Sequence, residues 1–114
     1  MKPSFTDRAF QLWEYRVSHG SLLIRSPKGP GVTRNIDLIC MGVEYLAAPR
    51  HLRGLQLVEA TAEEIRDLSG LLGKTLHPSN VRVISSQSRR YPIVAAGFEV
   101  SENDGDIFDS PFTK

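Results

Sequence analysis

Four arginines occur as two pairs in segments that carry turn-forming residues, and they are the side chains best suited to bind an anion. Arg50 and Arg53 stand close together in one segment. Arg89 and Arg90 follow a polar run of serine and glutamine, residues 85–88. Guanidinium groups bind phosphate or carboxylate through paired N–H donors, and neighbouring hydroxyl and amide groups can complete such a site. If the fold brings the loops together, the four arginines form an anion site; otherwise they are ordinary solvated side chains, which the net charge of +1 favours.

The three histidines and the single cysteine lack the spacing of a catalytic or metal-binding set. His19 lies in a predicted tight turn, and no acidic residue stands where it would orient the imidazole as a general base. His51 and His77 lie in separate loops, without the regular spacing of metal ligands. Cys40 lies in an apolar strand, where a thiol behaves as a small buried hydrophobe. We therefore expect no catalytic residue, no metal and no cofactor.

The aromatic residues near the N-terminus are candidates for an interaction surface. Trp13 and Tyr15 alternate along a predicted strand and should share one face, while Phe10 and Leu12 lie on the other. An apolar strand of this kind must be covered on both sides. Trp13 and Tyr15 are either part of the core or a platform for a partner.

Length and composition indicate one globular domain, residues 1–114. The chain has 40% hydrophobic and 24% charged residues, which lies outside the range of disordered sequences. No apolar run resembles a signal segment or a membrane span, so we expect a soluble, cytoplasmic protein without a membrane partner. We expect residues 1–8 and 101–114 to be flexible or loosely docked termini.

Apolar runs separated by Gly, Pro and Ser predict strands rather than helices along most of the chain. A hairpin comes first, with its reversal at Gly20. Farther on, the apolar residues change face near Gly42, which is typical of a bulged, kinked strand. The predicted strands are 10–17, 21–26, 36–45, 55–60, 81–84 and 93–100.

One helix interrupts the strands. Thr61 and Glu64 have the spacing of a capping box, and Gly73 is a suitable C-terminal stop. Between them, apolar residues recur at helical spacing, which predicts a stripe that packs on a sheet. The members of that stripe are Ile65, Leu68, Leu71 and Leu72.

These elements predict an α+β fold. The expected order is ββββαββ: a mostly antiparallel, curled sheet of about six strands with the helix packed on one face. One short helix covers only one side of such a sheet, so the other face should be open to solvent, to curvature or to a partner.

The leading hypothesis for function is a small binding domain without catalytic activity, of an accessory, regulatory or immunity type. It would engage a protein partner, or a second copy as a homodimer, through the uncovered sheet face or an edge strand. The alternative is an enzyme or an anion- or small-ligand-binding protein with a pocket near Arg89, Arg90 and His19. A second alternative is weak nucleic-acid binding through the arginine loops.

Overall fold

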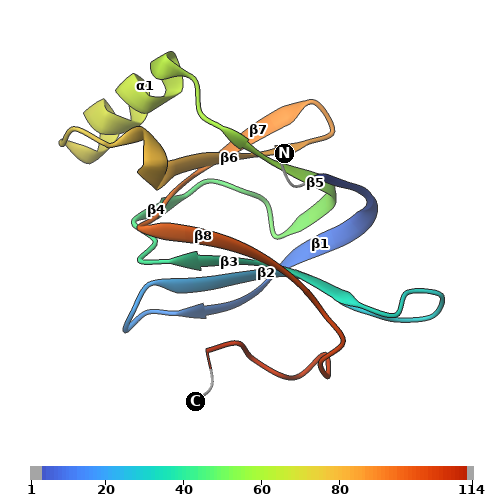
Figure 1. The fold of residues 1–114 in the computed structure, drawn as a ribbon. Coiled ribbons are helices and arrows are strands. Elements are labelled where there is room, and N and C mark those ends of the chain that lie inside the picture. Colours follow the sequence, from blue (N-terminus) through green and yellow to red (C-terminus); the bar gives the residue numbers. More distant parts are fainter. Residues whose placement is uncertain (1–3, 113–114) are drawn as a thin grey trace.

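The computed structural model describes residues 4–112 and has an α+β fold built on one antiparallel sheet (Figure 1). The sheet has eight strands, two more than the sequence pattern predicts. A single α-helix lies between the fifth and sixth strands in this part of the chain. The elements are β1 Ser4–Arg16, β2 Ser21–Ser26, β3 Asn35–Met41, β4 Tyr45–Leu46, β5 His51–Glu59, α1 Ala62–Leu72, the 3₁₀ turn η1 Pro78–Asn80, β6 Val81–Ser86, β7 Arg89–Val94 and β8 Gly97–Asn103.

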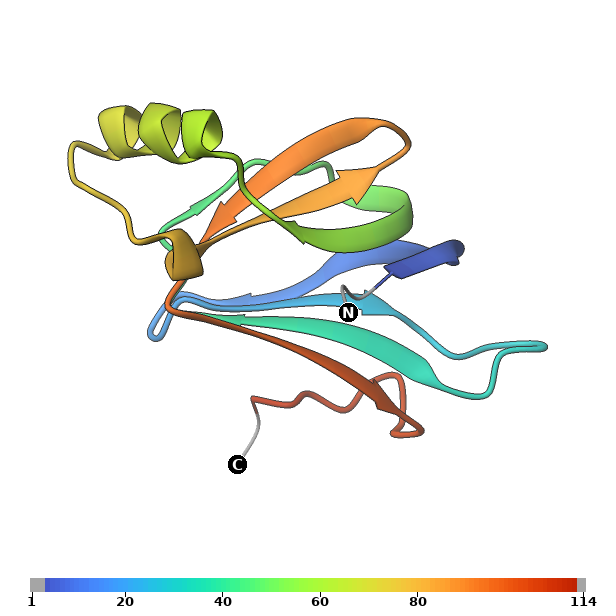
Figure 2. The same cartoon turned by 45° about the horizontal axis from the view of Figure 1, so that its top comes forward.

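The sheet curls so that its two halves lie over each other and is not closed. Its strand order is β4-β7-β6-β5-β1-β2-β3-β8. Figure 2 shows β5, β6 and β7 above β2, β3 and β8, with the main core between the two layers. Buried side chains of both layers meet in that core: Phe10, Leu22, Ile24, Ile36, Leu38, Cys40, Leu52, Leu55, Leu57, Ile84, Ile93 and Ala95.

The two additional strands arise because the chain crosses twice between the layers. The predicted strand 36–45 divides at Gly42 into β3 and β4, and the predicted strand 93–100 divides at Ala96 into β7 and β8. β3 pairs with β8, whereas β4 pairs with β7. At the crossing, the amide of Ala96 donates to the carbonyl of Met41 at 2.8 Å. We call this crossing, residues 41–44 and 94–97, the seam.

The helix forms as predicted and covers the outer face of the upper layer. Thr61 and Glu64 form the capping box, and Gly73 ends the helix in a left-handed conformation. Leu68 is buried in a second cluster with Val81 and Val94 of the strands, and Ile65 and Leu72 pack against it. The prediction that Leu71 belongs to this stripe is wrong, since its side chain is 63% exposed.

The outer face of the lower layer, which the sequence analysis leaves uncovered, is covered at β2. All six residues of β2 are buried. Leu22 and Ile24 face the main core, whereas Leu23 alternates with them and is still fully buried. Figure 2 shows the C-terminal segment, residues 104–112, running beneath this layer. The chain's own C-terminal segment thus occupies part of the face that we expected to be open.

No helix among residues 4–112 is long and apolar enough to cross a membrane.

Replacing Gly42 by alanine should destabilise the protein by about 1–2 kcal/mol. Gly42 has a φ of 62°, and an added Cβ would lie 3.1 Å from the Cβ of Ala96. Left-handed conformation is costly for residues with a side chain. Urea unfolding of Gly42→Ala measures the loss. Gly29→Ala is the matched control, because nothing lies within 4 Å of its added Cβ. Equal effects of the two substitutions would contradict a sterically restricted seam.

Candidate functional site

An apolar groove lies between β1 and β4. It has a volume of about 450 Å³. Leu12 and Tyr15 form one wall, and Val43 and Leu46 form the opposite wall, with Leu22 at its base in the core. The full lining is Leu12, Trp13, Glu14, Tyr15, Leu22, Val43, Glu44, Tyr45 and Leu46.

Both walls of the groove are free strand edges. The pairing of β1 with β5 ends at Gln11, and the amide of Leu12 donates to the carbonyl of Arg50 at 2.9 Å. From there to Arg16, β1 pairs with β2 alone within residues 4–112. β4 pairs with β7 alone in the same range. Within residues 4–112, the other side of residues 13–15 and of β4 therefore has no neighbouring strand.

A bulge in β1 separates the two aromatic residues that the sequence pattern places on one face. The register of β1 against β2 shifts between Leu12 and Glu14. Tyr15 then lies opposite Leu22, which faces the core, and its side chain is 50% exposed. The Trp13 ring instead lies over the guanidinium of Arg25, 5.4 Å away, on the outer face. The prediction that Trp13 and Tyr15 share a face is wrong, because the extra residue inverts the alternation.

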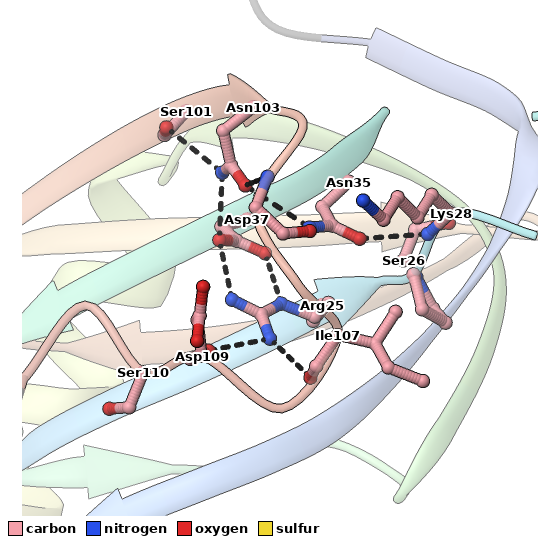
Figure 3. Close-up of polar contacts among 12 residues, drawn as sticks. Arg25, Ser26, Lys28, Asn35, Asp37, Ser101, Asn103, Ile107, Asp109 and Ser110 are labelled. Carbon is pink, nitrogen blue, oxygen red and sulfur yellow. Dashed lines mark hydrogen bonds and ion pairs between the residues drawn. The ribbon is translucent and has the colours of Figure 1, made fainter. Parts of the chain in front are cut away.

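Beneath the C-terminal segment lies a buried ion pair that no prediction includes (Figure 3). Arg25 and Asp37 stand opposite each other on β2 and β3, and each side chain is 3% exposed. The guanidinium donates to both carboxylate oxygens, Nε to Oδ1 at 2.7 Å and Nη2 to Oδ2 at 3.0 Å. Its Nη1 donates to the carbonyls of Ile107 and Asp109, each at 2.9 Å. The arginine thus binds the carboxylate and the C-terminal segment together.

Two asparagines extend this cluster to β8 (Figure 3). The Asn103 amide donates to Asp37 at 3.1 Å, and the Asn35 amide donates to Asn103 and to the carbonyl of Gly105. Among the described residues, every buried side-chain nitrogen and oxygen has a hydrogen-bond partner. The donors and acceptors are thus directed at one another, and the cluster acts as a structural clamp.

None of the four arginines of the hypothetical anion site lines the groove, and all four are exposed. Arg53 lines a second hollow of about 290 Å³ that also includes residues 85–87. Arg90 extends to the helix instead and binds both carboxylate oxygens of Glu64 at 2.8 Å. Arg50 and Arg89 do not line that hollow. Of the four arginines, only Arg53 therefore lines this hollow.

The histidines and the cysteine occupy separate places. His19 is exposed in the β1–β2 turn, and the His77 ring accepts a hydrogen bond from the Ser79 amide at the start of η1. Cys40 is buried in the core, and this burial raises the pKa of its thiol to about 12. Residues 4–112 contain no group of three or more His, Cys, Asp and Glu side chains that could hold a metal ion.

The ion pair has a signal in the sequence, whereas the groove has none. Arg25 and Asp37 each interrupt an otherwise apolar strand, and a register that pairs β2 with β3 makes them neighbours. The groove depends on where β1 stops pairing with β5, which no residue pattern marks. No protein-family model, curated protein or solved structure matches the chain.

Removing one member of the buried pair should cost about 3–5 kcal/mol, because the other charge stays buried without its partner. We expect this loss for Arg25→Met and for Asp37→Leu in denaturant unfolding. The double variant should lose less stability than the two single variants lose together, because it leaves no buried charge without its partner. Arg90→Gln, which removes an ion pair whose side chains are 43% and 28% exposed, should cost at most about 1 kcal/mol. Additive losses for Arg25 and Asp37 would contradict direct coupling of the two charges.

The exposed ion pair of Arg90 and Glu64 gives a second prediction. The pKa of Glu64 is lowered from 4.5 to about 2, first by the hydrogen bonds from Arg90 and then by those from Thr61. Because the pKa of Glu64 is depressed in the folded state, its ionised carboxylate stabilises the folded protein. This stabilisation is present above pH 4.5 and is lost as the pH falls toward 2.

In Arg90→Gln, the pKa of Glu64 should rise toward 4.5, and unfolding free energy should depend less on pH in this window. Carboxyl NMR titration measures the shift, with Arg89→Gln as the control. An unchanged pKa would show that Arg90 does not hold Glu64 in solution.

Proposed function

We propose that this protein is a protein-binding domain that takes an extended, apolar segment of a partner into the groove between β1 and β4. The observation that supports this most directly is the pair of free strand edges on the two sides of one apolar groove. A strand edge binds an extended chain through main-chain hydrogen bonds, and pockets beside it select alternate side chains.

The free edges favour a peptide over a small apolar molecule. Residues 13–15 of β1 and the two residues of β4 carry main-chain donors and acceptors on their open sides. A small hydrophobic ligand would exclude water from these groups without replacing its hydrogen bonds, which costs free energy. The main chain of an extended peptide offers both donors and acceptors along its edge. It can therefore replace the hydrogen bonds that these groups lose when water is excluded.

The side chains of the groove suit an apolar partner segment. Tyr15 is half exposed, and Leu12, Val43 and Leu46 are partly buried at the edge of the core. Large, partly exposed side chains bury more apolar surface when a partner binds, and tyrosines often contribute strongly to binding affinity. The groove therefore offers anchors for apolar residues at alternate positions of the bound chain.

A displayed library of random peptides provides the test, with the purified protein as the target. Selected peptides should shift the NMR signals of amides 13–16 and 44–46 and protect edge amides from hydrogen exchange. Tyr15→Ala should weaken binding about tenfold or more, because it removes an exposed aromatic anchor. Leu71→Ala, on the helix and 63% exposed, is the matched control and should bind as the wild type does.

Two results would overturn the proposal. One is a set of peptides whose shifts map to the Arg53 hollow or elsewhere away from the groove. The other is unchanged affinity in Tyr15→Ala. Light scattering decides between partners: a dimer that Tyr15→Ala dissociates would show that a second copy, rather than another protein, occupies the groove.

A further inference from the structure

We propose that the C-terminal segment, residues 104–112, braces the β1 wall of the groove from outside and holds it in its binding position. The consequence for affinity rests on the proposed function, whereas the bracing itself is a property of the free protein. The segment would then be part of the binding site without touching the bound chain.

The β1 wall is supported by a strand on one side only. Beyond Gln11 it loses β5 as a neighbour and pairs with β2, which pairs in turn with β3. A strand segment that is paired on one side opens more readily than one that is paired on both. Tyr15 and Val17, near the end of this segment, are 50% and 82% exposed.

The outer side of the wall contacts the C-terminal segment at two charged residues. Arg16 donates from Nη1 to the carbonyl of Phe112 at 3.4 Å, and its guanidinium lies 6.0 Å from the centre of the Phe112 ring. The pKa of the Glu14 carboxyl is lowered, first by the nearby Ser110 side chain and then by Arg16. Glu14 also binds Arg16 at 2.7 Å. Residues 110–112 therefore contact β1 on the face opposite the Tyr15 side chain.

Arg25 provides the third link between the segment and the wall. Its guanidinium lies over the Trp13 ring and donates to the carbonyls of Ile107 and Asp109. Asp37 fixes the position of this guanidinium. Trp13, Glu14 and Arg16 thus each contact the segment or the arginine that holds it, while Tyr15 lies on the opposite face of β1.

Coupling between the segment and the groove follows from these contacts. If docking of the segment orders the wall, then a peptide that binds the ordered wall must favour docking by the same factor. Typical couplings of this kind change affinity between 5- and 150-fold.

The double variant Ser110→Ala/Phe112→Ala tests the brace while keeping the Arg25 and Asp37 pair. We expect faster hydrogen exchange at amides 13–16, unchanged exchange in β5 and β6, and a red shift in the emission of Trp13, the only tryptophan. Peptides selected on the wild type should bind about tenfold more weakly. Phe108→Ala is the matched control, because this side chain in the same segment is 85% exposed.

Unchanged exchange at amides 13–16 in the double variant would overturn the brace, whatever the peptides do. Equal effects of Phe108→Ala and the double variant would also overturn it, because the loss would then not depend on contacts with β1. If no peptide binds the wild-type groove, the proposed function fails, and hydrogen exchange still decides the brace by itself.

Discussion

The buried pair of Arg25 and Asp37 is the interaction on which the lower layer depends. Removing two charges from water is costly, and it is compensated only when nearly every donor and acceptor is used. Here the guanidinium makes four hydrogen bonds, two to the carboxylate and two to main-chain carbonyls. The carbonyls belong to Ile107 and Asp109, so the pair is satisfied only when the C-terminal segment is in place. One interaction therefore covers β2, joins it to β3 and positions the end of the chain.

A second constraint operates at the seam, where strand pairing changes from one layer to the other. One segment of the chain contains β3 and β4, and another contains β7 and β8. The two segments pair with each other on both sides of the crossing, as β3 with β8 and as β4 with β7. Gly42 supplies the left-handed conformation that this change of direction needs, and the small Ala96 allows close approach. The short β4 is a result of this geometry. It brings Val43 and Leu46 to the groove and, within residues 4–112, leaves the outer edge of β4 without a neighbouring strand.

Local features were predictable from the sequence, and pairings between distant segments were not. The helix follows from Thr61, Glu64 and Gly73 because each acts within one turn of the chain. The division of the predicted strand 36–45 depends on its partner, since Met41 and Tyr45 pair with residues of different strands. Strand β7 also begins earlier than the pattern predicts: the turn before it uses Gln87 and Ser88 at positive φ, where glycine or asparagine would have marked a hairpin.

The same distinction explains what the sequence analysis found of the site. It identified Trp13 and Tyr15 as notable, but the bulge at Trp13 is defined only by the register with β2. That bulge gives the two residues separate roles, since Trp13 faces the clamp and Tyr15 faces the groove. An exposed, flat strand edge favours uncontrolled pairing with other chains, and proteins limit it by short strands, bulges and nearby charges. The groove has all three, in the two-residue β4, the bulge of β1 and the charge of Glu44. Because the open strand edges line a groove of limited volume, a single extended chain fits there more readily than the edge strand of another sheet. This steric restriction is what a selective site for an extended segment requires.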